Sequence, residues 1–261
     1  MSGVSLSNGE AEALVVLPQA AGKRLIGRAV ARLPQVERAK EAGLIVVGLG
    51  TTNAYVLEEL LGRPVIKERY RAGYIGKELA VLPPERREPM AVLLGGELRE
   101  MSWPEILARL SPGDVVIKGG NALDPTGAVG VFVAAEDGGT VGKFYAAALA
   151  RGVEVIIPIS RAKSVHIPIG KLAPKLGKGR LRWASGPKVG LFPLFGTVIT
   201  ETEAVEILYG VRAEHVASGG VGTGEGAVVL LLSGEAQAVE RAFSELSELA
   251  RREPAPSWEG G

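Results

Sequence analysis

A lysine, an amide and a carboxylate share one glycine-rich stretch, KGGNALDPTG, at residues 118–127. The stretch follows an apolar, strand-like run, and ligands of open α/β sheets bind beyond the carboxyl ends of strands. Glycine pairs such as Gly119 and Gly120 also allow a close approach to backbone. We therefore expect Lys118 to neutralise an anion, and Asn121 and Asp124 to orient hydroxyl groups. Lys118 and Asp124 are the candidate catalytic residues, with Asp124 as the proton-transfer group.

A second glycine-rich stretch, GGTVGK at residues 138–143, follows soon after the first. Its glycines, Gly138 and Gly139, with Thr140 open a predicted helix. Lys143 in the second turn of that helix could direct its ammonium group at the same ligand. A simpler interpretation is that Lys118 only pairs with Asp124, and that Glu136 and Asp137 are solvated turn acids.

The third candidate is the loop GLGTTN at residues 48–53. Its place between a buried strand and a helix leaves free N–H groups that can hold an anion. Glu68 lies about 20 residues further on, as in a dinucleotide fingerprint, but Asn53 replaces the third glycine. A purely structural turn, a dinucleotide site and a phosphate site remain alternatives. Hydroxyl groups favour phosphate, and the predicted phosphate-binding residues are Gly48, Gly50, Thr51, Thr52 and Asn53.

Composition limits the classes of function. The chain has no cysteine and only two histidines, so we expect no metal ion, and we expect no cofactor. The net charge of +1 gives no general attraction to nucleic acid or membrane. The N-terminus lacks the features of a signal peptide, so we expect a cytoplasmic protein. The basic segment 161–182 could grip nucleic acid, but a solvated linker is the preferred interpretation.

Alternating strand and helix patterns predict an α/β fold with a mostly parallel sheet. Predicted helices cover about residues 22–42, 51–61, 103–110 and 144–150, and predicted strands cover 44–47, 64–66, 90–94, 114–117 and 153–158. The order β-α-β-β-α after residue 191 suggests a smaller α+β domain of ferredoxin-like type. The glycine-rich segment 219–226 is expected to be a mobile hairpin that could act as a lid.

These patterns divide the chain into five segments. We expect an N-terminal lead-in (1–21), an α/β ligand-binding domain (22–167), a basic Gly/Pro-rich connection (168–190), a small α+β domain (191–252) and a disordered tail (253–261).

Three segments together resemble the ribose-5-phosphate isomerase A superfamily, which includes DeoR-type sugar-phosphate sensors and CoA transferases. They are GLGTTNAYVLEELLG, GDVVIKGGNALDPTG and GGTVGKFYAAALARGVEVIIPISRAKSV. The resemblance implies an isomerase/CoA-transferase-like sheet and carries over the anion-binding residues Gly50, Thr51, Thr52, Gly119, Gly120 and Lys143. Lys118 and Asn121 stand where the isomerase has catalytic aspartates, and no carboxylate replaces its catalytic glutamate.

The sequence therefore predicts a glycine-lined anion site for a small phosphorylated metabolite, either a sugar phosphate or a nucleotide-like compound. Whether the protein is an enzyme stays open, with isomerase-like or transferase-like chemistry if it is. The alternatives are a non-catalytic metabolite sensor and an NAD-dependent oxidoreductase. We also expect a homo-oligomer.

Overall fold

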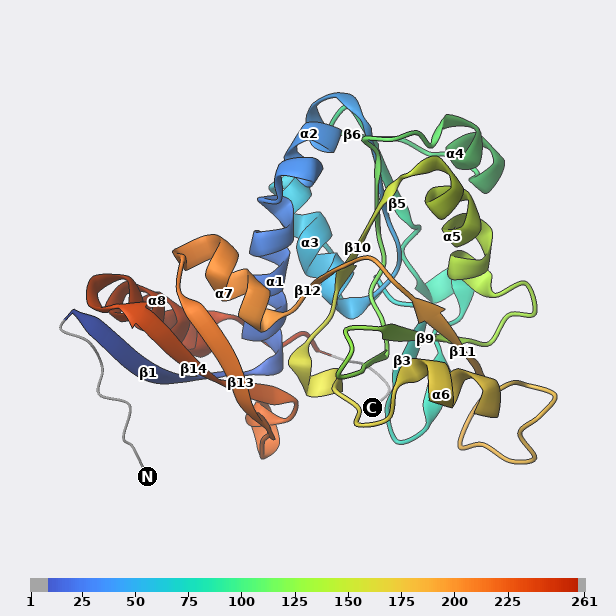
Figure 1. The fold of residues 1–261 in the computed structure, drawn as a ribbon. Helices are drawn as coiled ribbons and strands as arrows, with labels where there is room; N and C mark the ends of the chain where they lie inside the picture. The colour runs from blue at the N-terminus through green and yellow to red at the C-terminus, as the bar shows by residue number, and fades with distance from the viewer. Residues whose placement is uncertain (1–8, 258–261) are drawn as a thin grey trace.

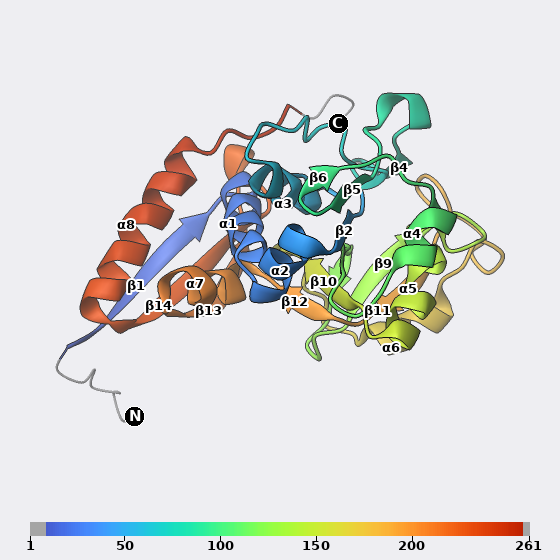
Figure 2. The same ribbon diagram turned by 90° about the horizontal axis from the view of Figure 1, so that it is seen from above.

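The structure is a computed structural model and describes residues 9–257. A large α/β region and a smaller three-stranded sheet lie side by side, with helix α1 (Gln19–Ala31) between them (Figures 1 and 2). Buried side chains of both regions belong to one continuous core along α1. The two regions therefore share their core.

The large region is organised by a mixed six-stranded sheet in the order β12-β10-β7-β2-β5-β6. The first four strands run parallel to one another, and β5 and β6 run antiparallel to their neighbours. The strands are β2 (Leu44–Val47), β5 (Ala91–Leu94), β6 (Glu97–Leu98), β7 (Val115–Ile117), β10 (Glu154–Pro158) and β12 (Thr197–Ile199).

The main sheet is mixed, so the expectation of a mostly parallel sheet is not confirmed. Over all described sheets, three strand pairings are parallel and seven are antiparallel. The reason in the main sheet is the segment between α3 (Thr51–Leu61) and β5. It returns to the carboxyl end of β2, where the Gly50 N–H donates to the Tyr70 carbonyl at 3.0 Å. β5 starts from that edge and must run the opposite way.

Both faces of the main sheet are covered, as the apolar strand sequences predict. Ile45 and Val47 face the core shared with α1 and α3, while Leu44 and Val46 face the opposite core. Side chains at alternate positions of a strand point to opposite faces, so a strand covered on both sides must be apolar throughout. The opposite face is covered by α4 (Trp103–Arg109) and α5 (Gly139–Arg151). A capping box between Ser102 and Glu105 starts α4.

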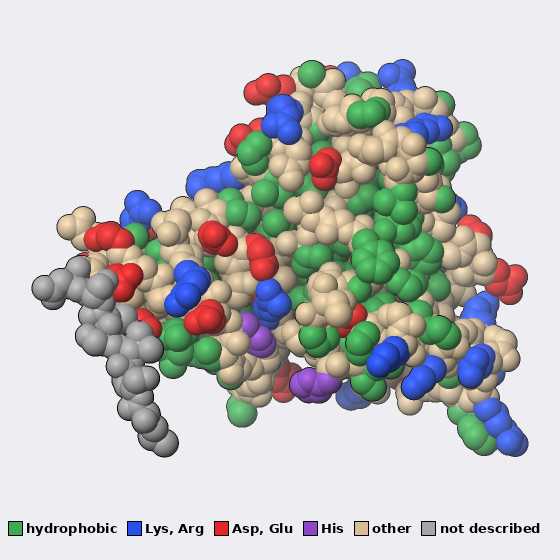
Figure 3. Space-filling view, viewed as in Figure 1, with side chains coloured by type: hydrophobic (Ala, Val, Ile, Leu, Met, Phe, Trp, Pro, Cys, Tyr) green, Lys and Arg blue, Asp and Glu red, His purple; other side chains and the backbone are tan. Residues whose placement is uncertain are grey.

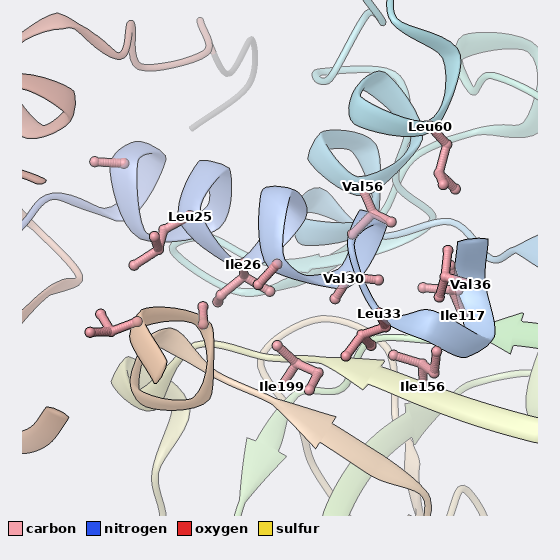
Figure 4. Close-up of a cluster of buried hydrophobic side chains, with 14 of the residues drawn as sticks. Leu25, Ile26, Val30, Leu33, Val36, Val56, Leu60, Ile117, Ile156 and Ile199 are labelled. Atoms are coloured by element: carbon pink, nitrogen blue, oxygen red, sulfur yellow. The ribbon is translucent and has the colours of Figure 1, made fainter. Parts of the chain in front are cut away.

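Helix α1 is buried on almost every side. Its apolar side chains pack against α3 and the sheet (Figure 4). A Cβ at Gly27 would lie 3.0 Å from the backbone of Tyr55, so glycine permits the close approach of α1 to α3. The predicted single helix 22–42 is wrong, because α1 ends at Ala31 and α2 (Pro34–Ala42) begins at a proline. Proline favours the first turn of a helix over its interior.

The small sheet has the order β1-β14-β13 and is entirely antiparallel. Its elements are β1 (Glu10–Leu17), β13 (Arg212–Gly219), β14 (Ala227–Glu235), α7 (Glu201–Tyr209) and α8 (Ala236–Arg252). Residues 10–17 are therefore a strand, and the predicted lead-in is wrong for that part, while residues 1–8 lie outside the described residues. β12, predicted for the small domain, joins the main sheet beside β10.

The remaining strands surround the glycine-rich stretch 118–127. β8 (Ala122–Leu123), β9 (Val129–Val133) and β11 (Gly190–Leu194) form an antiparallel sheet, and β3 (Gly73–Ile75) pairs with β4 (Leu79–Val81). The short turns are η1 (Pro84–Arg86), η2 (Arg161–Lys163), η3 (Ala173–Lys175) and η4 (Gly222–Gly224). The predicted strand 64–66 is not formed.

The basic connection contains the short helix α6 (Ile169–Leu172), and Lys and Arg side chains gather over this part of the surface (Figure 3). At the C-terminal end, Glu253 is held by the Arg24 guanidinium at 3.0 Å. The tail predicted for 253–261 therefore begins with an anchored residue, and residues 258–261 lie outside the described part. Within that part, no helix is long and apolar enough to cross a membrane.

We expect Leu17→Ala to test whether β1 belongs to the core. Leu17 is 0% exposed, and removing a buried leucine side chain should lower the free energy of unfolding by about 2–5 kcal/mol. Leu149→Ala is the matched control, because Leu149 is 59% exposed on α5 and its loss should change stability by less than about 0.5 kcal/mol. Equal effects in urea unfolding would contradict the described packing of β1.

Candidate functional site

Four parallel strands end at the same edge of the main sheet, and a polar residue follows each end. Asn53 follows β2, Lys118 follows β7, Lys163 follows β10 and Glu201 follows β12. Backbone hydrogen bonds hold the loops in this order: the Gly48 N–H donates to Ile117, and the Lys118 N–H donates to Ile156. This edge is where ligands bind in open α/β sheets.

The loop after β2 meets two other segments at Gly48. A Cβ at this position would lie 3.0 Å from Cδ of Lys118 and 3.9 Å from Cγ2 of Thr140. Gly48 therefore lies where the three segments meet, and a larger residue would require the Lys118 side chain to shift. The three glycine-rich stretches therefore come together at Gly48, Lys118 and Thr140, one residue from each stretch.

Asn53 lies at the centre of this convergence and is 0% exposed. Its Nδ2 donates to the Gly48 carbonyl at 2.7 Å, which fixes the orientation of the amide. Its Oδ1 has no hydrogen-bond partner, and Gly50, which precedes α3, gives that helix no side-chain cap. The first turn of α3, from Thr51 to Asn53, is thus an uncapped helix N-terminus beside an unsatisfied buried acceptor. Such a helix end attracts anions.

Three lysines approach this edge from different elements. Burial and, to a smaller extent, repulsion from Lys163 together lower the pKa of Lys118 to about 8. Burial also lowers the pKa of Lys163 to about 8, against the attraction of Glu201. Lys23, on α1 and 5% exposed, has a pKa lowered to about 7 by burial and by repulsion from Lys163. Lys163 therefore repels both Lys118 and Lys23.

Lys118 and Lys163 retain ammonium donors for a ligand. The Nζ of Lys118 donates to the Gly119 carbonyl at 3.0 Å, and the Nζ of Lys163 donates to the Gly120 carbonyl at 2.7 Å. An ammonium group has three N–H donors. Both side chains keep part of their surface accessible although protein atoms surround them closely.

Glu201 is the buried acid of this edge and is 1% exposed. Burial raises the pKa of its carboxyl group, although the Arg161 N–H donates to it at 2.8 Å. A Cβ at Gly22 would lie 2.9 Å from Oε1 of Glu201, so Gly22 lets α1 pack against this carboxyl group. Glu201 thereby partly compensates the charges of Lys23 and Lys163.

The carboxylate of Asp124 is held by hydrogen bonds and is not placed to transfer protons. Its carboxylate accepts hydrogen bonds within one turn and from the start of α6; the donors are Thr126 N and Oγ1, Ala128 N and Ile169 N. Burial alone would raise its pKa, but these bonds outweigh burial and lower it. A carboxylate with its lone pairs so occupied is a poor base at neutral pH. The geometry therefore gives Asp124 a structural role, against the prediction that it transfers protons or pairs with Lys118.

Other predicted ligand-binding residues have structural partners. Oδ1 of Asn121 accepts from the Phe132 N–H at 2.9 Å, within the hairpin of β8 and β9. A Cβ at Gly120 would lie 2.1 Å from Val129, so this glycine is required by packing. Gly119 faces Oδ1 of Asn53, at 3.4 Å from such a Cβ, and so stays at the site.

The second glycine stretch reaches the site only through Thr140. Gly138 and Gly139 take positive φ angles where α5 begins, as the sequence suggests. Lys143 is exposed and pairs with Asp137 at 3.9 Å, so its ammonium is directed at the surface. The prediction that Lys143 contacts the same ligand as Lys118 is not supported by this arrangement.

The glycine-rich segment 219–226 approaches Lys23 through Gln19. A Cβ at Gly226 would lie 2.8 Å from Nε2 of Gln19, whose Oε1 accepts from Nζ of Lys23 at 2.7 Å. This position agrees with the lid alternative without testing it. A separate hollow of about 380 Å³ lies between Arg161 and β13. The Arg161 guanidinium is occupied there by Glu203, Thr200 and Thr202, which leaves little for a ligand.

The sequence patterns do not predict Lys23, Lys163 or Glu201 as residues of the site. Lys163 follows a predicted strand end, PISRAK, and that position was a usable signal. Lys23 has no such signal, because its burial depends on the small sheet packing over α1. Within the described residues, no group of His, Asp and Glu is arranged to hold a metal ion.

Comparisons with known proteins give no family assignment: no family model matches the chain, and neither the curated proteins nor the solved structures contain a significant match.

The lowered lysine pKa values predict how stability changes with pH. Below pH about 7 these lysines are protonated in both the folded and unfolded states, and burial of their charge destabilises the fold fully. Between pH about 7 and about 10.5, the ordinary lysine pKa, the unfolded chain binds more protons, so the free energy of unfolding should rise with pH. Lys118→Met should reduce this slope by the order of one proton, measured by urea unfolding at several pH values.

The exposed Lys40 on α2 supplies the control, since Lys40→Met removes a lysine away from the site. If the slope of Lys118→Met equals that of wild type, Lys118 is not desolvated as described.

Proposed function

We propose that this protein binds a small phosphorylated metabolite at the carboxyl ends of β2, β7, β10 and β12. The observation that carries the proposal is the meeting of Lys118 and Lys163 with the uncapped N-terminus of α3. Two closely spaced amines repel each other and lose hydration when buried, and a bound anion relieves both effects. The N–H groups at Thr51 and Thr52 supply further donors for phosphate oxygens.

The resemblance to the ribose-5-phosphate isomerase A superfamily, with a cytoplasmic location, is part of this proposal. All three segments that resemble that superfamily contribute to the proposed site, through residues 48–53, residues 118–120 and Lys163. The four parallel strands of the mixed sheet would be the part of the fold that this protein has in common with the superfamily.

A sugar phosphate or a nucleotide-like compound fits the proposed site better than a dinucleotide. Asn53 is buried where a dinucleotide fingerprint has its third glycine, and the Gly50 N–H is already bonded to Tyr70. These features favour phosphate binding over the NAD-dependent alternative.

The enzymatic and sensor alternatives rest on different observations. The hydrogen bonds of Asp124 and the absence of the family's acids at 118 and 121 favour a sensor without chemistry. Amines with pKa values near 8 favour an enzyme, because at neutral pH they exchange protons readily. Incubating the bound compound with the protein in D₂O separates them. An enzyme produces deuterium exchange or product signals in NMR spectra, and a sensor leaves the compound unchanged.

Calorimetry tests the binding proposal after a thermal-shift screen of sugar phosphates, nucleotides and CoA esters. The best compound should bind with uptake of protons at pH about 8.5, because an anion raises the pKa of nearby amines. Repeating the titration in buffers of different ionisation heat measures that uptake. Lys118→Met and Lys163→Met should each weaken binding roughly 10- to 100-fold, the loss of one charge-assisted hydrogen bond.

Lys143→Met is the matched control and should leave the affinity unchanged, because Lys143 is exposed and paired with Asp137. The proposal fails if no compound raises the melting temperature, or if Lys143→Met weakens binding as much as Lys118→Met does.

A further inference from the structure

The small sheet has one covered face and one open face. Val15 and Leu17 of β1 point into the core with Leu230 and Leu232 of β14. Helices α7 and α8 lie above the three strands in the view of Figure 1. Alternate residues point to the opposite face, and Leu14 and Val16 there are 59% and 53% exposed. A solvent-facing strand position usually carries a polar residue.

The open face is apolar across adjacent strands. Leu14 of β1 lies opposite Leu231 of β14, and Val16 lies opposite Val229. Val216, at the irregularity in β13, is also 53% exposed and extends the apolar area beside Val229. These side chains form a surface that we call the open-face patch: Leu14, Val16, Val216, Val229 and Leu231. The exposed Glu214 of β13 lies beside Leu231 and ends the patch on that side.

Charged residues border the open-face patch in a pattern that complements itself. Glu12 of β1, Ser233 of β14 and Arg212 of β13 lie in one row across the sheet. Nε of Arg212 donates to Oγ of Ser233 at 3.1 Å, so Arg212 lies across this row. A two-fold axis parallel to β14 places β1 of one copy over β13 of another. Glu12 then faces the partner subunit's Arg212, and Leu231 faces the partner subunit's Leu231. Glu214, on the edge strand, lies over the partner subunit's Leu14 at the border of the contact.

We infer that the open face binds a second copy of this chain in a symmetric dimer. Three strands of about nine residues give a face of roughly 30 by 14 Å, or about 400 Å² in each copy. This is below the roughly 800 Å² per partner of a standard interface. We therefore expect a dimer that dissociates readily.

Sedimentation velocity from about 1 to about 200 μM should show a reversible monomer–dimer equilibrium. Leu231→Lys puts two ammonium groups against each other on the axis and should weaken the dimer by at least about 10-fold. Leu149→Lys is the control, because this exposed leucine lies on α5 in the large region and should leave the equilibrium unchanged.

Charge reversal tests the orientation without altering the core. Glu12→Arg and Arg212→Glu should each weaken the dimer roughly 2- to 5-fold, and the double variant should recover most of the loss. Circular dichroism confirms that each variant is folded. The inference is overturned if the wild type stays monomeric over the whole range, if Leu231→Lys leaves the equilibrium unchanged, or if the charge reversals are additive.

Discussion

Burial of three lysine ammonium groups near one edge of the main sheet is the interaction on which the account of this molecule depends. Lys118 and Lys163 lose hydration and repel each other, and within residues 9–257 Glu201 is the one group that attracts Lys163. Backbone carbonyl groups of Gly119 and Gly120 hold the two amines in place. Such an arrangement is unfavourable for stability by itself. Strongly perturbed pKa values of this kind concentrate at functional sites.

The two parts of the fold serve this edge in different ways. The parallel strands place the ends of β2, β7, β10 and β12 together, so residues far apart in sequence become neighbours. The small sheet packs against α1, and this packing buries Lys23 beside Glu201. The antiparallel strands β8, β9 and β11 hold the glycine stretch through Asp124 and Asn121. Those two residues therefore support the site without facing a ligand.

The sequence predicted the elements better than their partners. The strand 44–47 and the helices 51–61 and 103–110 lie where the sequence predicts them, because the signals for these elements are local. The pairing of β1 with β14 spans the whole chain, and no local pattern announces it. The meeting of the loop 48–53 with Lys118 followed from strand order. The burial of Lys23 could not be predicted, because it depends on packing between two sheets.

The pKa values of the buried lysines can be measured by NMR titration. With selectively ¹³C-labelled lysine and assignment by Lys118→Met and Lys163→Met, the Cε signals report each pKa. We expect pKa values of about 8 for both residues, and an upward shift of both when inorganic pyrophosphate is added. Values near the ordinary 10.5, unchanged by pyrophosphate, would contradict this expectation.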